Sequence, residues 1–179
     1  MSVKLDACIN CNLCVRACRE VQVNDVIGMA YRGSTAKVIF DLDDPMGEST
    51  CVACGECVQA CPTGALMESS LVNKEGARVN YADRTVDSVC PYCGVGCQTQ
   101  VHVKDDKILY VDGKDGPANE NRLCVKGRFG FDYINHEGRL TKPLIRKAGV
   151  PKDPNFQLKD SEISDYFEET SWENALDLA

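Results

Sequence analysis

CINCNLCVRAC at residues 8–18 and CVACGECVQAC at residues 51–61 share one cysteine spacing, C-x2-C-x2-C-x3-C. The two stretches lie 43 residues apart, so they form an internal repeat. A third group with another spacing begins with CPYCGVGC at residues 90–97 and is joined at a distance by Cys124. These groups contain all 12 cysteines of the 179-residue chain. We therefore expect a fold that is organised around cysteine side chains.

The composition explains why such cysteines would be needed. Aromatic residues make up only 7% of the chain, and a small apolar core usually needs disulfides, zinc or metal clusters to support it. The first residues, MSVKLDACIN, lack the apolar segment of a secretory leader, which disfavours disulfides. No apolar run reaches the ~18 residues that span a bilayer. We expect a cytoplasmic chain without membrane contact.

The charge balance bears on possible partners. With 20 Lys and Arg against 27 Asp and Glu, the formal net charge is −7. Binding to nucleic acid requires a basic stripe that faces the phosphates. The sequence therefore predicts no nucleic-acid partner.

The repeated spacing favours [4Fe–4S] clusters. Three thiolates of a cube come easily from one loop, and in two-cluster ferredoxins the fourth cysteine of each run reaches the other cluster. Applied to this chain, that pattern gives the first cluster Cys8, Cys11, Cys14 and Cys61, and the second cluster Cys18, Cys51, Cys54 and Cys57. Pro62 follows Cys61 as in the bacterial pattern, whereas Arg19 follows Cys18. Gly55 and Gly64 suit a loop whose N–H groups approach sulfur.

Zinc is the main alternative ligand for these thiolates. Zinc sites usually pair two C-x2-C knuckles, and the overlapping triplets of the repeats do not fit that arrangement well. The third group supplies three ligands from one loop, Cys90, Cys93 and Cys97, and a remote fourth, Cys124. This arrangement also suits a cube, although its spacing leaves zinc open.

Short strands and turns are expected between the cysteine groups, which indicates an α+β fold. Alternating apolar residues predict two hairpins. The first joins residues 26–33 to residues 36–43, and the second joins residues 98–104 to residues 107–113. Residues 43–47 form a turn, and residues 144–169, rich in Pro, Lys and Asp, are expected to run along the surface. Thr170 and Glu173 match a capping box that begins a helix.

The cysteine groups resemble a known enzyme family. Residues 1–70 resemble the two-cluster ferredoxin-like segment in the catalytic subunits of cytoplasmic, NAD-linked formate dehydrogenases. Residues 84–140, with CPYCGVGC and RLCVKG, resemble the [4Fe–4S] domain that begins the molybdopterin oxidoreductases. The resemblance divides the chain into these two modules, a connector at 71–83, and an extended segment at 141–179 that includes the truncated start of a catalytic domain.

The resemblance implies an electron relay. In the family, formate is oxidised at molybdenum or tungsten held by two pterin guanine dinucleotides. Electrons then leave through the cluster that corresponds to Cys90, Cys93, Cys97 and Cys124. They continue through the ferredoxin-like clusters to a flavin and iron–sulfur partner subunit that reduces NAD. Lys126 matches the lysine between cluster and pterin.

Three clusters leave no cysteine to bind the catalytic metal. His102, in an expected strand, and His136, in a polar loop, are interpreted as structural. We therefore expect an N-terminal relay fragment with three [4Fe–4S] clusters that is not catalytic alone and lacks its C-terminal catalytic domain. The alternatives are a stand-alone polyferredoxin-type carrier, a relay segment of a related enzyme such as a nitrate reductase, and a zinc-stabilised interaction module.

Overall fold

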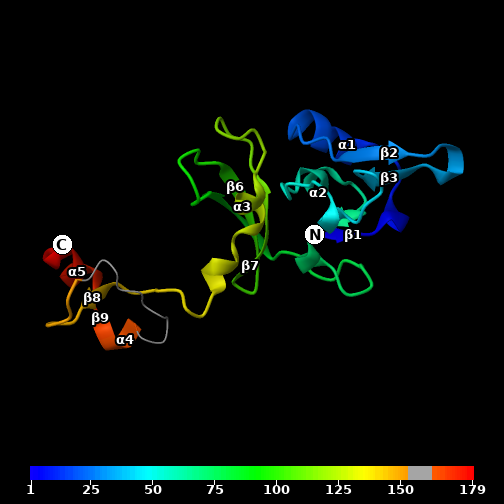
Figure 1. Cartoon of the computed structure of the whole chain (residues 1–179). Helices are drawn as coiled ribbons and strands as arrows, with labels where there is room; N and C mark the ends of the chain where they lie inside the picture. Colours follow the sequence, from blue (N-terminus) through cyan, green and yellow to red (C-terminus); the bar gives the residue numbers. More distant parts are fainter. Residues whose placement is uncertain (153–162) are drawn as a thin grey trace. The chain divides into compact units, whose positions relative to one another are not determined.

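The computed structural model describes residues 1–152 and 163–179. Two compact units make up the chain, Met1–Asp132 and Tyr133–Ala179, and each is described by itself. Short helices and small antiparallel sheets alternate along both units, giving a mixed helix and sheet structure as expected (Figure 1).

The helices and strands are short. The helices are α1 (Leu13–Arg16), α2 (Glu56–Ala60), α3 (Val125–Phe129), α4 (Ile163–Tyr166) and α5 (Trp172–Leu178). The strands are β1 (Ser2–Val3), β2 (Ile27–Ala30), β3 (Lys37–Phe40), β4 (Leu66–Met67), β5 (Arg84–Val89), β6 (Gln98–Lys104), β7 (Lys107–Gly113), β8 (Leu144–Arg146) and β9 (Phe167–Glu169). Single tighter or wider helical turns are η1 (Leu5–Ala7), η2 (Ala17–Val21), η3 (Gly33–Thr35), η4 (Met46–Glu48), η5 (Ser69–Leu71) and η6 (Asp132–Asn135).

The two repeats share one apolar core. Strands β2 and β3 pair antiparallel with Ile27 opposite Phe40, which confirms the first predicted hairpin. Strand β1 pairs with β4 and so brings the start of the chain to the end of the second repeat. Figure 1 shows α1 and α2 beside this hairpin. Buried aliphatic residues and cysteines from both repeats pack together, so the core depends on the cysteine loops: Cys14, Val15, Cys18, Val26, Ile27, Val38, Phe40, Cys57, Val58 and Leu66.

A three-stranded antiparallel sheet, β5-β6-β7, forms the second part of the first unit. Its β6–β7 hairpin confirms the second prediction, including the turn at Asp105 and Asp106. The register shifts between His102 and Val103, as at a β-bulge. Strand β5 was not predicted, because all six of its residues are exposed and apolar alternation marks it only weakly.

Hydrogen bonds tie the segment that connects the two parts to both of them. Asn73 Oδ1 accepts from the amides of Glu75 and Ala77, which closes a local turn. Lys4 Nζ donates to the Glu75 carbonyl at 2.9 Å, and Lys104 Nζ in β6 donates to Asn80 Oδ1 at 3.2 Å. The connector therefore contributes to the first unit as ordered structure.

In the second unit, β8 and β9 pair antiparallel. The prediction of surface chain did not include this strand pairing at residues 144–146 and 167–169, and residues 153–162 lie outside the described part. Helix α5 confirms the predicted C-terminal helix, but its cap is Ser171, whose Oγ accepts from the Asn174 amide at 3.2 Å. The predicted capping box was placed one residue too early, because the hydroxyls of Thr170 and Ser171 are equivalent in sequence.

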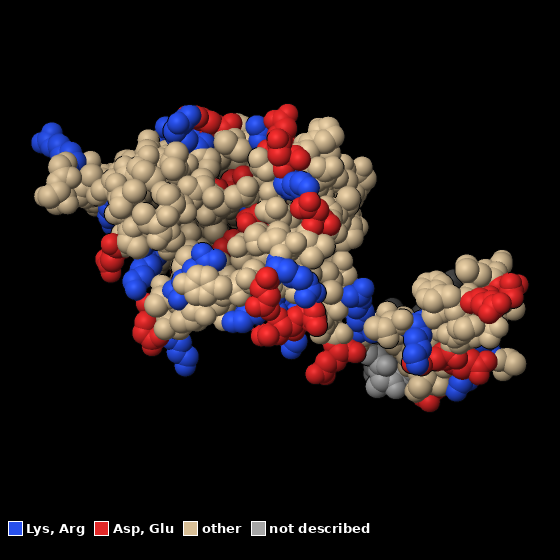
Figure 2. All heavy atoms as spheres, turned by 180° about the vertical axis from the view of Figure 1, so that it is seen from behind, with Lys and Arg blue, Asp and Glu red and all other residues tan. Residues whose placement is uncertain are grey.

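Within the described residues, none of the helices combines the length and the apolarity needed to cross a bilayer. On the face drawn in Figure 2, basic and acidic side chains are interspersed. Exposed ion pairs of the first unit include Arg19 with Asp25 at 2.6 Å and Lys37 with Asp43 at 2.6 Å.

Candidate metal centres

The two repeated cysteine loops have the same backbone conformation. Asn10 and Ala53, at equivalent positions, have φ of 55° and 53°, and Asn12 and Gly55 have φ of 66° and 77°. Left-handed residues at these positions turn backbone N–H groups inward. The amides of Asn10 and Ala53 lie 3.4 and 3.3 Å from the sulfurs of Cys8 and Cys51, respectively. N–H···S contacts of this kind stabilise thiolate and cluster sulfur.

Four cysteines from both repeats line one small cavity. They are Cys8, Cys11, Cys14 and Cys61. Apolar side chains, including Leu5, Val38 and Leu66, complete the wall. Burial raises the pKa of the Cys14 thiol, and the neighbouring thiolates of Cys8, Cys61 and Cys11 raise it further. The fourth cysteine of the second repeat therefore lies with the first three cysteines of the first repeat.

The reciprocal group shows the same crossing. Burial strongly raises the pKa of Cys57, and the thiolates of Cys54, Cys51, Cys14 and Cys18 raise it further. Around Cys54 the thiolates that raise the pKa are those of Cys51 and Cys18. Cys18 comes from the first repeat, and its sulfur lies 3.3 Å from the Val26 amide. Four close thiols in an apolar setting need a positive centre to remain ionised together, and iron supplies one.

Cys61 has a polar environment of its own. Burial acts to raise the pKa of this thiol, but the amides of Leu66, Thr63 and Gly64 and the Thr63 hydroxyl together lower it below its ordinary value. Gly55 and Gly64 both have positive φ, which glycine adopts readily, and Gly64 provides one of these amides. The turn after Cys61 therefore favours a thiolate.

The third group is more exposed. The Cys90 amide donates to the Cys97 carbonyl at 2.9 Å, which closes the loop, and Gly96 has φ of 64°. Burial raises the pKa of Cys97, and the thiolates of Cys90, Cys93 and Cys124 raise it further. Cys124 caps α3, so the remote fourth cysteine reaches the loop from the start of a helix.

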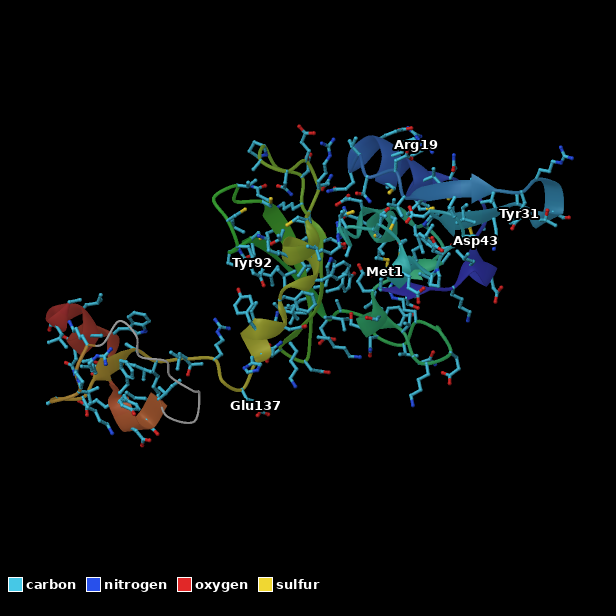
Figure 3. All side chains as sticks on the ribbon, viewed as in Figure 1. Met1, Arg19, Tyr31, Asp43, Tyr92 and Glu137 are labelled. Atoms are coloured by element: carbon cyan, nitrogen blue, oxygen red, sulfur yellow. The ribbon has the colours of Figure 1, made fainter. Side chains whose placement is uncertain are left out.

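Helix α3 also contacts the third loop away from its cap. A Cβ on Gly127 would lie 3.6 Å from the sulfur of Cys90. Tyr92, labelled in Figure 3, donates from its hydroxyl to the Gly130 carbonyl at the end of α3. The Tyr92 hydroxyl thus ties the loop to the C-terminal end of α3.

All 12 cysteines are described, and none forms a disulfide. Among the described residues, no three His, Cys, Asp or Glu side chains are placed closely enough to hold a single metal ion. The donor sets fit a cluster better than one ion, because four sulfurs line a cavity and inward N–H groups face several of them.

The other predicted site residues lie elsewhere. Lys126 is exposed on α3, two residues after Cys124. His102 lies in β6, stacks on the Tyr110 ring at 4.0 Å, and has its Nε2 3.2 Å from Asp112 Oδ2. His136 Nδ1 accepts from the Gly138 amide at 3.1 Å. Neither histidine lies with a cysteine group.

Sequence reasoning missed Arg128, whose side chain is fully buried. Its Nη2 donates to Glu56 Oε1 at 2.8 Å and to Gln59 Oε1 at 2.7 Å, and its Nε donates to the Cys54 carbonyl at 2.7 Å. These partners belong to the second repeat, more than 60 residues away. One signal in the sequence was Glu56, a charged residue among the apolar and cysteine positions of α2, which indicates that a basic partner is needed.

Two families match separate parts of the chain. Residues 7–65 match the 4Fe-4S dicluster domain, and residues 83–136 match the molybdopterin oxidoreductase Fe4S4 domain. The first match contains both repeats, and the second contains the third cysteine group with Arg128.

Curated relatives align with nearly all of the chain. A Staphylococcus haemolyticus protein named "Putative formate dehydrogenase" is 34% identical over 97% of the chain and 20% of its own length. "Probable oxidoreductase YjgC" of Bacillus subtilis is 35% identical over 96% of the chain and 19% of its own length. The chain thus spans about a fifth of the length of these relatives. Residues 7–65 are thus similar to a 4Fe-4S dicluster domain, and residues 83–136 are similar to the Fe4S4 domain of the molybdopterin oxidoreductases.

Proposed function

We propose that the chain binds three [4Fe–4S] clusters and works as the electron relay of a formate dehydrogenase. The first ligand set is Cys8, Cys11, Cys14 and Cys61, the second is Cys18, Cys51, Cys54 and Cys57, and the third is Cys90, Cys93, Cys97 and Cys124. When bound, each cluster accepts and releases one electron at a time.

The observation that carries this proposal is the exchange of the fourth cysteine between the repeats. Cys61 lines the cavity of the first repeat's cysteines, and Cys18 lies with the second repeat's cysteines. The sequence predicted this crossing from the two-cluster ferredoxin pattern. A chain that used its cysteines only as local zinc knuckles would have no reason to exchange them.

Formate as the substrate rests on the names of the relatives. Under this proposal, formate is oxidised at a molybdenum or tungsten bis-pterin site built mainly by residues beyond this chain. Lys126, exposed beside Cys124, would face the pterin. The chain itself supplies ligands, N–H donors to sulfur and a shielded core, and it is not expected to oxidise formate alone.

The finer assignments follow the same proposal. Residues 1–70 would be the two-cluster module, 71–83 the connector, 84–140 the pterin-side module and 141–179 the start of the catalytic domain. Electrons would pass to a flavin and iron–sulfur subunit that reduces NAD in the cytoplasm. The exposed third group suits a role next to a further domain, because Cys93 and Cys124 are accessible.

The first experiment measures cluster content in the anaerobically reconstituted chain. Three cubes correspond to about 12 iron and about 12 acid-labile sulfide atoms per chain.

Replacing Cys61 with Ser should disturb the cluster at Cys8, Cys11 and Cys14, as followed by EPR and Mössbauer spectroscopy. Cys57→Ser is the matched control, since it should disturb the other cluster of the pair. Zinc as the bound metal, iron near eight atoms, or a purely local effect of Cys61→Ser would contradict the proposal.

A second experiment addresses Lys126 in the full-length protein. Lys126→Ala should slow the reduction of the clusters by formate. Iron content should stay unchanged, because Lys126 is not one of the proposed cluster ligands. Lys152→Ala, a change at another exposed lysine, should leave the rate unchanged. An unchanged rate in Lys126→Ala would contradict the pterin-side role.

A further inference from the structure

Arg128 connects the second and third cysteine groups through hydrogen bonds. Its amide donates to the Cys124 carbonyl at 3.1 Å, and its side-chain Nε donates to the Cys54 carbonyl at 2.7 Å. Both carbonyls belong to proposed cluster ligands, one in each group. Two hydrogen bonds through one residue therefore join the backbone of Cys124 to the backbone of Cys54.

The rest of the guanidinium is fixed by further partners. Nη1 donates to Asp112 Oδ1 at 3.1 Å and lies 3.4 Å from the Val111 carbonyl, both in β7. Nη2 donates to Glu56 and Gln59 in α2. The planar guanidinium thus meets acceptors from two different elements, and its rigid geometry sets their relative placement.

The second repeat is shaped to admit this side chain. Gly55 has φ of 77°, and a Cβ at this position would overlap with Cδ and Nε of Arg128. The equivalent position in the first repeat is Asn12, which has a side chain. Glu56 completes the contact, because its Oε1 also accepts from the buried Leu123 amide at 3.0 Å, next to Cys124.

We propose that Arg128 is a positioning residue for electron exchange between the second and third cysteine groups. It holds the Cys54 carbonyl and the Glu56 carboxylate against α3 and β7, and so fixes the separation of the two ligand sets. The role rests on the proposed function, since it requires clusters at both groups.

Two physical effects would follow from this placement. Electron tunnelling falls steeply with distance, so a loosened contact between the groups slows exchange. The guanidinium is also a buried positive charge beside the second ligand loop, and such a charge favours the more negative, reduced state of a cluster. Position and charge can be separated, because Lys keeps the charge but lacks the planar fork.

The test uses the reconstituted 179-residue chain with Arg128→Lys and Arg128→Gln. The readouts are iron content, the magnetic splitting between reduced clusters in EPR, and the reduction potentials. Both variants should lose the splitting between the second and third clusters. Only Arg128→Gln should also lower the potential of the second cluster. Arg122→Gln is the control, because this exposed arginine lies in the same segment and pairs with Glu120 at 3.6 Å.

The outcomes separate this role from the proposed function. A wild-type chain without three clusters would refute the proposed function itself. Full iron content with unchanged splitting and potentials in both Arg128 variants would overturn the positioning role. If these variants do not fold, Gln59→Ala decides, because this exposed residue can be replaced without opening the core. It should weaken the splitting, and an unchanged splitting would overturn the role.

Discussion

The two cysteine repeats have the same spacing and the same loop conformation, yet only the second binds the neighbouring sheet through Arg128. Helix α1 in the first repeat has an exposed ion pair, Arg16 with Glu20 at 3.1 Å. Helix α2 in the second repeat has a buried pair, Glu56 with Arg128 at 2.8 Å. The repeated cysteines determine the cluster loops, and the residues between them determine which loop docks.

Three substitutions between the repeats account for this difference. Asn12, Leu13 and Arg16 of the first repeat correspond to Gly55, Glu56 and Gln59 of the second. The glycine makes room for Arg128, and the two polar residues accept its hydrogen bonds. An arginine at position 59 would instead place a second guanidinium beside the first.

The largest effect is expected from Glu56→Leu, which copies the residue of the first repeat. It removes Glu56 as one of the two charged partners of the buried Arg128 guanidinium, the other being Asp112. It also leaves the Leu123 amide without its acceptor. Removing one partner of a buried pair costs about 3–5 kcal/mol of unfolding free energy. Denaturant titration of the reconstituted chain measures this loss.

The matched control for that change is Leu13→Gln at the equivalent, partly exposed position. Surface changes of this kind usually stay within about 0.5 kcal/mol. Similar losses at both positions would mean that docking by Glu56 does not distinguish the repeats.

A smaller loss is expected from Gly55→Ala. The new Cβ would overlap with Arg128, and the left-handed φ of 77° adds strain, so we expect a loss of about 3 kcal/mol. Asn12→Ala, at φ of 66° in the first repeat, should cost only about 1 kcal/mol because it adds no overlap. The same denaturant titration compares the two. Equal costs would show that the left-handed backbone conformation, and not the space that the Arg128 side chain occupies, makes glycine necessary at position 55.

The sequence predicted the parts of the fold that depend on local patterns. Cysteine spacing predicted the crossing of Cys18 and Cys61, and Cys61 lines the cavity of the first repeat's cysteines. Apolar alternation predicted both hairpins, which the structure contains. Arg128 was not predicted, because its partners lie about 70 residues away and each looks like an ordinary polar residue. Ligand identity at the 12 cysteines remains a prediction that the reconstitution experiments address.

A third prediction concerns the protonation of His102 in acid. His102 Nε2 lies 3.2 Å from Asp112 Oδ2, whereas Arg128 donates to the other carboxylate oxygen, Oδ1. Burial lowers the pKa of His102, although Asp112 opposes this effect. The unfolded chain therefore binds the proton more readily than the folded chain. Stability from neutral His102 is present above the unfolded pKa of about 6.5 and is lost as pH falls through the lower folded pKa.

His102→Phe should remove this dependence and keep the stacking on Tyr110. Its unfolding free energy should vary less between pH 7 and pH 5 than that of the wild type. Denaturant titrations at both pH values measure the change. If the unfolding free energies of the wild type and the variant change in parallel with pH, protonation of His102 does not weaken the contact between Asp112 and Arg128.

The smallest effect is expected in the first repeat, from Arg16→Gln. This change copies the residue at position 59 and removes the ion pair with Glu20. The side chain of Arg16 is 63% exposed, and that of Glu20 is 54% exposed. Exposed pairs four residues apart on a helix contribute about 0.3–0.5 kcal/mol, because water and salt screen their charges. High salt should therefore abolish the difference from the wild type in denaturant titrations. Iron content should remain unchanged, since neither side chain contacts a cysteine sulfur in the described structure. A loss as large as that of Glu56→Leu would mean that the first repeat also docks through α1, and the distinction between the repeats would then fail.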